Sequence, residues 1–371
     1  MQADDVSTLT TTVLWSAFGL AILFGALAQR SHFCTMGAIA DIVTMGDWTR
    51  MRMWILAFAV AVLGFNVMAG LGWVSASNSL YAGPQFRWAS TVVGGTMFGI
   101  GMVLASGCGS KSLVRVGGGN LKSLVVVIVL GLSAFATLKG ITAVVRVATV
   151  DRWVLTIPPG QDLPSLIGHA MGLRAEAIAP WLGLVLAAVL IAWVVRRPEG
   201  RSASMWLGGA GIGAVIVAMW WVSGRWGFVA EDPSTLQEAF VATNSHRMEA
   251  LSMAAPVGYA LAWLLYFSDQ SNVLTTGIVS VAGVVIGSAA VALATGRFRW
   301  EGFAHAEDTA NHLVGAVLMG IGGVTALGCT VGQGLSGLST LSIGSALATA
   351  AIVAGGWLGL RYQSWRLDRS A

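Results

Sequence analysis

Apolar runs of about 20 residues recur along this chain and constrain its fold more than any other feature. A helix rises about 1.5 Å per residue, so about 20 apolar residues cross the roughly 30 Å hydrocarbon core of a bilayer. Hydropathy and chain-breaking residues predict nine transmembrane helices, at residues 13–29, 51–73, 88–106, 122–146, 181–195, 203–223, 273–295, 311–327 and 341–360. The sequence therefore predicts an all-α integral membrane protein with a single transmembrane domain over residues 1–371.

Four shorter apolar segments do not reach spanning length. They begin near Cys34, Cys108, Leu251 and Cys329, and such lengths are typical of re-entrant or interfacial helices. The segment after Leu251 is the longest and is an alternative tenth span. We expect about nine spans and four short re-entrant helices.

The composition excludes an ordinary soluble fold. Of the 371 residues, 56% are hydrophobic and 10% are charged, whereas a soluble domain carries about 25% charged residues. The net charge of +4 comes from Lys and Arg in short loops, so it indicates membrane topology and not nucleic-acid binding. The first apolar run follows Asp4 and Asp5 without a basic residue, so we interpret it as a span and not as a cleaved signal peptide.

An internal repeat appears at a constant offset of 221 residues. Residues 93–108 read VGGTMFGIGMVLASGC and residues 314–329 read VGAVLMGIGGVTALGC, with nine of the sixteen positions identical. The identities include four Gly and the final Cys, which chance similarity between two apolar helices hardly supplies. We assign a first repeat to residues 13–146, a linker with one connecting span to residues 147–202, and a second repeat to residues 203–361.

Each repeat holds four spans, and one extra span joins them, so the second repeat is predicted to enter the membrane from the opposite side. Transporters with such inverted repeats bind substrate near the bilayer midplane, at the repeat interface. Most Lys and Arg fall on the side that follows the first span, among them Arg50, Lys111 and Arg297. The positive-inside rule then places the amino terminus outside and the carboxy terminus in the cytoplasm.

Each of the three cysteines begins one of the short segments. At the amino end of a helix, unpaired N–H groups and the positive dipole end favour an anion. Cys is also a small buried hydrophobe in many membrane proteins. All three cysteines stand at the start of a short segment, which favours a functional role. The repeat relates Cys108 to Cys329 and places Ala255 opposite Cys34.

Residues around the cysteines complete the candidate substrate-binding set. Gly107, Gly109 and Gly328 bracket the predicted helix breaks and permit close backbone approach to a passing solute. Thr330 and Gln333 follow Cys329 in the same short segment. The other glycines of the repeat, such as Gly94 and Gly315, we interpret as helix-packing positions.

Asp41 and Lys111 are accessory candidates. Asp41 is a carboxylate within an apolar segment and is therefore a functional candidate by default. The alternative is a structural role, in which Asp41 is hydrogen-bonded to a neighbouring backbone group or Arg. Lys111 and Arg115 are explained most simply as positive-inside anchors, although their closeness to Cys108 is also suited to attracting an anion. His32 and His312 are isolated, so no metal site is predicted. No cofactor-binding motif is present, and the chain is expected not to be an enzyme.

The run from Arg30 to Cys34 and the two Gly-Cys segments resemble the three-cysteine pattern of the YeeE/YedE family of sulfur-compound transporters. The resemblance implies an hourglass-like bundle and uptake of thiosulfate across a bacterial inner membrane. It also implies that Cys34, Cys108 and Cys329 pass the ion inward by S–H contacts. The lipid bilayer and a small cytoplasmic sulfur-carrier protein are the other expected partners.

Three other functions stay open. A carrier of selenium compounds or of another reduced sulfur compound would use a similar path. A membrane thiol redox protein would need a cysteine pair close enough to exchange, and no two of the three are adjacent in sequence. A soft-metal carrier would use Cys and Met, but the 14 Met are scattered without MxxM clusters.

Overall fold

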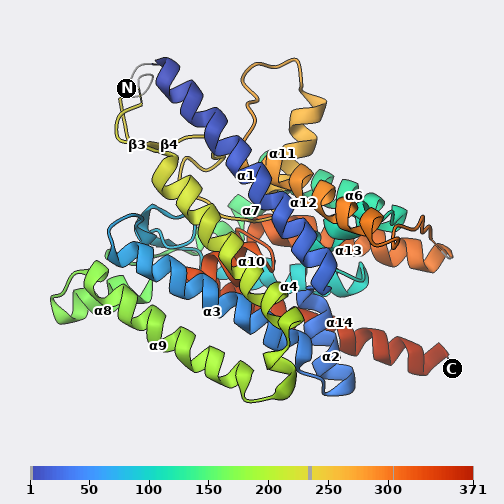
Figure 1. Cartoon of the computed structure of the whole chain (residues 1–371). Coiled ribbons are helices and arrows are strands. Elements are labelled where there is room, and N and C mark those ends of the chain that lie inside the picture. The colour runs from blue at the N-terminus through green and yellow to red at the C-terminus, as the bar shows by residue number, and fades with distance from the viewer. Residues whose placement is uncertain (1–2, 233–235, 304, 371) are drawn as a thin grey trace.

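The computed structural model describes residues 3–232, 236–303 and 305–370 and is predominantly helical (Figure 1). The long helices are α1 (Ala3–Ser31), α3 (Thr49–Gly70), α4 (Trp88–Leu104), α6 (Leu121–Lys139), α9 (Ala175–Val195), α10 (Ala203–Trp221), α12 (Thr276–Ala294), α13 (Ala306–Thr325) and α14 (Ile343–Ser370). The shorter ones are α2 (Thr35–Met45), α5 (Gly109–Gly117), α7 (Ile141–Ala148), α8 (Leu163–Met171) and α11 (Ala254–Leu265). Figure 1 places the two termini at opposite ends of the bundle.

Short elements join these helices. The 3-10 turns are η1 (Ala76–Asn78), η2 (Val150–Arg152) and η3 (Pro198–Arg201), and the π-helical segments are η4 (Val222–Trp226) and η5 (Gly332–Gly337). Strand β1 (Gln85–Phe86) pairs antiparallel with β2 (Leu155–Thr156), and β3 (Phe228–Val229) pairs antiparallel with β4 (Ala239–Phe240). Each pair is a two-stranded sheet that joins loops between helices.

The prediction of an all-α membrane protein is confirmed. Within the described chain, eight segments are long and apolar enough to cross a membrane. Helix α13, which covers most of the eighth predicted span at 311–327, is not among these eight. It begins with Glu307 and Asp308, and Lys122 Nζ lies 3.0 Å from the Asp308 carboxylate.

Two predicted boundaries and the alternative tenth span were wrong. The span predicted at 122–146 ends at Lys139, because Gly140 takes an extended conformation and α7 starts separately. The span predicted at 181–195 begins earlier, at Ala175, since Pro180 lies inside α9 with its ring against Gly70 of α3. The alternative tenth span after Leu251 is the 12-residue α11, which is too short to cross a bilayer.

Helices α4 and α13 cross through glycines that approach reciprocally. A Cβ atom added to Gly94 would lie 2.7 Å from the Gly322 carbonyl oxygen, and one added to Gly315 would lie 2.6 Å from the Gly101 carbonyl oxygen. At the repeat offset of 221 residues, Gly94 corresponds to Gly315 and Gly101 corresponds to Gly322, so the repeat relates the first contact to the second. Two antiparallel helices related by a twofold axis would show this pattern, so the crossing supports the inverted repeat, which stays a prediction for the whole chain.

Other helix pairs follow the same correspondence. Helix α4 packs against α14, and α13 packs against α6; likewise α1 packs against α12, and α10 packs against α3. Helix α9 packs along α3 and joins the two halves. The short helix α2 contacts α3 and α14. Its counterpart α11 contacts the corresponding helices, α12 and α6. Each short segment is thus held between long helices.

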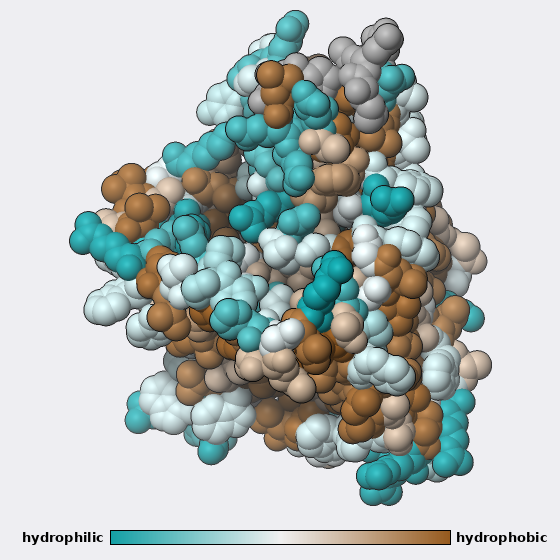
Figure 2. All heavy atoms as spheres, turned by 90° about the vertical axis from the view of Figure 1, so that its left-hand side faces the viewer, coloured by the Kyte–Doolittle hydropathy of each residue, from teal (hydrophilic) through white to brown (hydrophobic). Residues whose placement is uncertain are grey.

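Aromatic side chains fill the centre, and apolar side chains also cover the outside. Phe65 and Trp220 are fully buried, with ring centroids 5.2 Å apart, and Trp220 Nε1 donates a 3.0 Å hydrogen bond to the Ser339 hydroxyl. Trp15 and Trp181 are each 69% exposed. On the face in Figure 2, hydrophilic residues gather at the upper and lower ends, with large hydrophobic patches between them. This is the surface expected of a protein solvated by lipid.

Candidate functional site

The three cysteines follow the same backbone turn. In each case the residue two positions before the cysteine has a positive φ, although none is a glycine. These residues are His32, Ser106 and Leu327, with φ of 54°, 56° and 58°. A left-handed conformation costs a non-glycine residue about 1–2 kcal/mol. Strain of this kind is found at sites where the surroundings impose it, and no sequence signal announces it here because glycine is absent.

The turn closes the preceding helix in the same way at the two repeat-related cysteines. Gly107 N–H donates to the Met102 carbonyl at 2.8 Å, and Gly328 N–H donates to the Gly323 carbonyl at 2.8 Å. Such six-to-one bonds satisfy carbonyls that a helix end leaves free. The two helices therefore stop at corresponding residues and deliver Cys108 and Cys329 in the same local geometry.

Two thiols accept hydrogen bonds from the backbone that follows them. Cys34 is the N-cap of α2, and its Sγ accepts from Gly37 N–H at 3.2 Å. Cys329 Sγ accepts from Gly332 N–H at 3.5 Å. Because the sulfur accepts in each case, its own S–H proton is left to donate to another group.

Cys108 differs from both in its partner. It is the N-cap of α5, and its Sγ lies 3.2 Å from the Ser110 hydroxyl, where either atom can donate. Cys329 departs from the expectation in another way. After it come a turn and the π-helical η5, which begins only at Gly332, so Cys329 does not cap a regular α-helix as Cys34 and Cys108 do.

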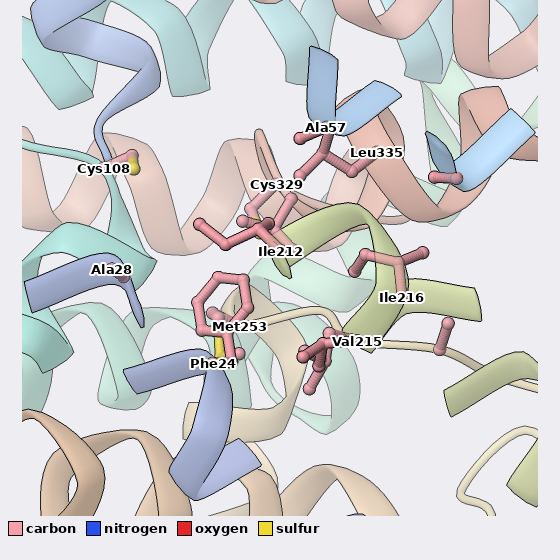
Figure 3. Close-up of a cluster of buried hydrophobic side chains, with 14 of the residues drawn as sticks. Phe24, Ala28, Ala57, Cys108, Ile212, Val215, Ile216, Met253, Cys329 and Leu335 are labelled. Atoms are coloured by element: carbon pink, nitrogen blue, oxygen red, sulfur yellow. The ribbon is translucent and has the colours of Figure 1, made fainter. Parts of the chain in front are cut away.

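The three thiols are free and buried, with exposed fractions of 9%, 1% and 0% along the chain. Figure 3 shows Cys108 and Cys329 in one buried apolar cluster that also holds Phe24 and Met253. Cys108 is an electrostatic neighbour of both other thiols. A solute that met all three would therefore meet Cys108 between the other two, and apolar side chains would have to move to let it pass.

A cavity of about 290 Å³ opens close to Cys329. We call it the vestibule; its lining includes Tyr81, Arg87, Gln161, Arg247, Leu327 and Gln333. Within the described chain, neither arginine lies within salt-bridge distance of a carboxylate. Arg87 Nη2 donates to the Gln85 side chain at 3.4 Å, and Arg247 Nη1 donates to the Ser79 carbonyl at 3.4 Å. The vestibule thus holds two positive charges that no carboxylate neutralises.

Three buried polar atoms near Cys329 lack hydrogen-bond partners in the described chain; Gln333 and Ser345 line the vestibule, whereas Thr330 lines a separate small cavity. The Thr330 hydroxyl, Gln333 Oε1 and the Ser345 hydroxyl have no hydrogen-bond partner in the described part of the chain, although all three residues are at least 96% buried. Gln333 Nε2 is used, because it donates to the Ala326 carbonyl at 2.6 Å. A buried polar atom without a partner costs about 1–3 kcal/mol. Hydroxyl donors in this position are therefore available to an anion.

A second group of charges surrounds Cys34, at the far end of α3 from the vestibule loops. We call it the basic cluster; its members are His32, Arg50, Lys111, Arg115 and Arg297. Lys111 is partly buried and is an electrostatic neighbour of both the Cys34 and Cys108 thiols. No carboxylate lies within salt-bridge distance of Lys111 in the described chain. Arg115 Nη1 donates to the Ser106 carbonyl at 2.7 Å, and Arg297 Nη1 lies 3.3 Å from His32 Nε2.

Asp41 and the three candidate glycines have protein neighbours. Asp41 Oδ2 lies 2.9 Å from Arg50 Nε, so this carboxylate is ion-paired at the edge of the basic cluster. Cβ atoms added to Gly107, Gly109 and Gly328 would lie 3.0–3.6 Å from the nearest side-chain atoms, which are those of Lys111, Leu130 and Gln333. The space beside each glycine is occupied by protein atoms in this conformation.

One part of this arrangement, the vestibule, escaped the sequence reasoning. The vestibule arginines come from loops far apart in the chain, and neither loop has a motif. In the described residues, no group of three His, Cys, Asp or Glu is placed to hold a metal ion. What the geometry offers is a line of soft thiols between two basic groups, which is suited to passing an anion and not to retaining one.

Comparisons with known proteins agree with this chemistry. Residues 30–358 match the model of a protein family described as sulphur transport. The chain is 25% identical over 358 residues to the thiosulfate transporter TsuA of Spirochaeta thermophila, covering 93% of this chain and 97% of that protein. It is 28% identical over 346 residues to the thiosulfate transporter TsuA of Escherichia coli, covering 91% of this chain and 88% of that protein. A shorter match, 31% over 113 residues, joins it to the probable transporter YedE of E. coli, covering 29% of this chain and 26% of that protein.

Proposed function

This chain belongs to the sulphur transport family and is a multi-pass membrane transporter of a sulfur compound, not an enzyme, and we propose that the compound is thiosulfate. The ion is taken up across a bacterial inner membrane, with the amino terminus outside and the carboxy terminus in the cytoplasm. One observation carries the proposal: three buried free thiols follow the same backbone turn and lie between two groups of basic side chains, in which Arg50 alone is ion-paired with a carboxylate of the described chain.

The chemistry of thiosulfate suits this arrangement. It is a dianion with a soft terminal sulfur, so a path for it needs positive potential at its ends and weak soft donors in the middle. Arg87 and Arg247 supply the potential in the vestibule. The thiols supply S–H donors in the interior, where a full counter-charge would hold the ion too tightly. Conduction requires several sites of moderate affinity in sequence.

The proposed order of passage follows from the lining residues. The ion enters the vestibule, where the Ser345 hydroxyl is available, and moves past Leu327 to Cys329. It then reaches Cys108, which neighbours both other thiols, and finally Cys34 beside Lys111. The basic cluster attracts the ion toward the cytoplasm, where a small sulfur-carrier protein is the proposed acceptor.

Uptake of radiolabelled thiosulfate into proteoliposomes that contain only this protein tests the substrate. We expect concentration-dependent uptake that excess unlabelled thiosulfate abolishes and sulfate leaves nearly unchanged. Selenium oxyanions and sulfite, added as competitors, test the selenium and reduced-sulfur alternatives. No uptake of thiosulfate under any imposed gradient would overturn the substrate assignment.

Two further measurements address the remaining alternatives. Reporters fused before Val13 and after Ala371 should be active outside and in the cytoplasm, respectively. A carboxy-terminal reporter active outside would contradict the proposed orientation. Mass spectrometry of the purified protein should show three unlinked thiols, whereas a stable intramolecular disulfide would favour the redox function.

A further inference from the structure

A second cavity, of about 120 Å³, lies against the vestibule. The two share Leu80, Tyr81 and Leu327 in their walls. The second cavity also has Glu249 in its lining, a carboxylate that the anion path does not use. A carboxylate is an unfavourable group to place beside the entrance of a dianion, so its presence needs an explanation.

Glu249 is held firmly in place. Its carboxylate accepts a 2.9 Å hydrogen bond from Ser245 N–H. Its backbone is fixed at both polar atoms, since Glu249 N–H donates to the Ser223 hydroxyl at 2.9 Å and that hydroxyl donates to the Glu249 carbonyl at 2.5 Å. Within the described residues, no cation lies within salt-bridge distance of this carboxylate.

The charged and titratable groups around Glu249 come from its own loop, from the segment before β1, and from α7 and α11. His246 precedes it in the same loop, Tyr81 lies between η1 and β1, and Tyr259 is on α11. Arg146, on α7, lines the same cavity, but its Nε lies 3.3 Å from Asp151 Oδ2 and its charge is matched there. Burial raises the pKa of the Glu249 carboxyl, and this outweighs the lowering effect of the hydrogen bonds from Ser245.

The Tyr81 hydroxyl connects this carboxyl to the anion path. It hydrogen-bonds to Ser252 and is an electrostatic neighbour of both Glu249 and Cys329. A Cβ atom added to Gly332, whose N–H contacts the Cys329 thiol, would lie 3.3 Å from that hydroxyl. An ion at Cys329 would therefore interact with the charge on Glu249 through a low-dielectric interior.

We propose that Glu249 is a proton-binding site and that the proton at Glu249 and the anion at Cys329 bind together. The inference rests on the proposed function, because it takes the anion at Cys329 to be the transported one. Ionised Glu249 repels a dianion there, and protonated Glu249 does not. The proton comes from water on the vestibule side and goes to the carboxylate oxygen, so each bound anion takes up one proton at a pH where Glu249 would otherwise be ionised.

The sign of the pH effect follows from linkage. A bound dianion raises the pKa of Glu249, so binding takes up a proton and affinity is highest at low pH. Above the pKa of the anion-free carboxyl, affinity should fall about tenfold per pH unit until the pKa of the anion-bound form is reached. Glu249→Gln imitates the protonated carboxyl, so this variant should keep the low-pH affinity over the whole range.

The test is proton uptake by purified protein in weakly buffered detergent solution when thiosulfate is added, followed with a pH-sensitive dye. We expect up to one proton per bound anion for the wild type and none for E249Q. His246→Gln is the matched control, because His246 is the neighbouring imidazole in the same loop, and it should leave proton uptake unchanged. Binding without proton uptake in the wild type, or loss of the uptake in H246Q instead of E249Q, would overturn the proposal.

A measurement without thiosulfate separates this proposal from the choice of substrate. The infrared difference between wild type and E249Q should contain a protonated carboxyl band that persists to a pH above the ordinary range of Glu. If that band titrates in the ordinary range, the proton site is absent, whatever the protein carries. If the band behaves as expected but thiosulfate does not bind, the substrate assignment fails and the proton site stands. Should E249Q not fold, Glu249→Asp keeps a carboxyl and should still take up a proton on binding.

Discussion

The breaks at Cys108 and Cys329 begin alike and end differently. Before the cysteine, both share four glycines, the same positive-φ turn and the same closing hydrogen bond. After it, one chain forms the α-helix α5 with Lys111 and Arg115, and the other forms the π-helical η5. At the offset of 221 residues, Lys111 corresponds to Gly332 and Arg115 corresponds to Ser336. The shared part positions a thiol, and the different part decides whether that thiol has a positive charge beside it.

On the proposed path, this difference would supply a direction that the shared turns alone do not. The charges near Cys108 and Cys34 are built into helix starts and the adjoining loops, close to the thiols. Those on the Cys329 side come from Arg87 and Arg247, in loops at the rim of the vestibule. On the proposed path, an entering ion would meet positive charge at a distance first, then neutral hydroxyls and a thiol, and finally the basic cluster.

Removal of the two repeat-related thiols should have the largest effect. We expect Cys108→Ala and Cys329→Ala each to lower thiosulfate uptake at least tenfold, because a hydrogen bond to a charged group contributes about 1.5–3 kcal/mol and about 1.4 kcal/mol corresponds to a factor of ten. Ser, a harder donor of similar size, should restore little. The measurement is the initial rate of uptake in proteoliposomes, normalised to inserted protein.

Ser280→Ala is the matched control for these variants. Ser280 is 1% exposed on α12, and its hydroxyl donates to the Thr276 carbonyl. It therefore loses one buried heavy atom without touching the thiols, and its uptake should be unchanged. Normal uptake by a protein in which both Cys108 and Cys329 are Ala would show that the thiols only fill space.

Loss of the charge beside the thiols should have the next largest effect. Replacement of Lys111 by Gln removes a charge near Cys34 and Cys108, and we expect uptake to fall about three- to tenfold, consistent with a few kcal/mol at most for charges at intermediate dielectric. Lys122→Gln is the control, because Lys122 is already paired with Asp308. If Lys111→Gln transports normally, Lys111 is a topology anchor, as the sequence alone suggested.

Much of the fold could be predicted from the sequence, because membrane spans are constrained by length alone. Helices α3, α4, α10 and α12 begin within three residues of the predicted positions, since polar or chain-breaking residues flank each run. The breaks at the cysteines were predicted from the shortness of the apolar segments. These predictions depend only on local composition and on the repeat.

Other features depend on tertiary contacts and could not be predicted. The π-helical η5 forms where Gly332 packs against Ser252 and Tyr81, two residues from distant segments. Likewise, the place of Lys111 beside Cys34 follows from how α2 and α5 meet and not from any spacing in the chain. The break at Gly140 was missed because the apolar pattern continues beyond it into α7.

The vestibule arginines should act mainly on substrate capture. Arg247→Gln should raise the half-saturating concentration of thiosulfate about three- to fivefold and leave the maximal rate nearly unchanged, since an exposed charge steers ions but is screened by salt. The difference from wild type should shrink at high ionic strength. Arg174→Gln is the control, because Arg174 is 86% exposed at the side chain and paired with Glu176 at 3.1 Å. An equal effect of both variants would remove the vestibule from the capture step.

Substitutions at the glycines where α4 and α13 cross should have the smallest effect on transport. They test what the two breaks share, namely the helices that precede Cys108 and Cys329. A Cβ atom at Gly94 would lie 2.5 Å from Ala326 N, and one at its repeat counterpart Gly315 would lie 2.6 Å from Ala105 N. Overpacking of this kind costs about 1–3 kcal/mol, so Gly94→Ala and Gly315→Ala should lower the thermal midpoint by similar amounts. Uptake per folded molecule should stay close to wild type. Gly19→Ala, on the open face of α1 with no atom within 4 Å, should leave the midpoint unchanged or raise it slightly. Markedly unequal effects at Gly94 and Gly315 would show that the two helices do not cross on a twofold axis, and the asymmetry of the path would then extend from the breaks into the helices that carry them.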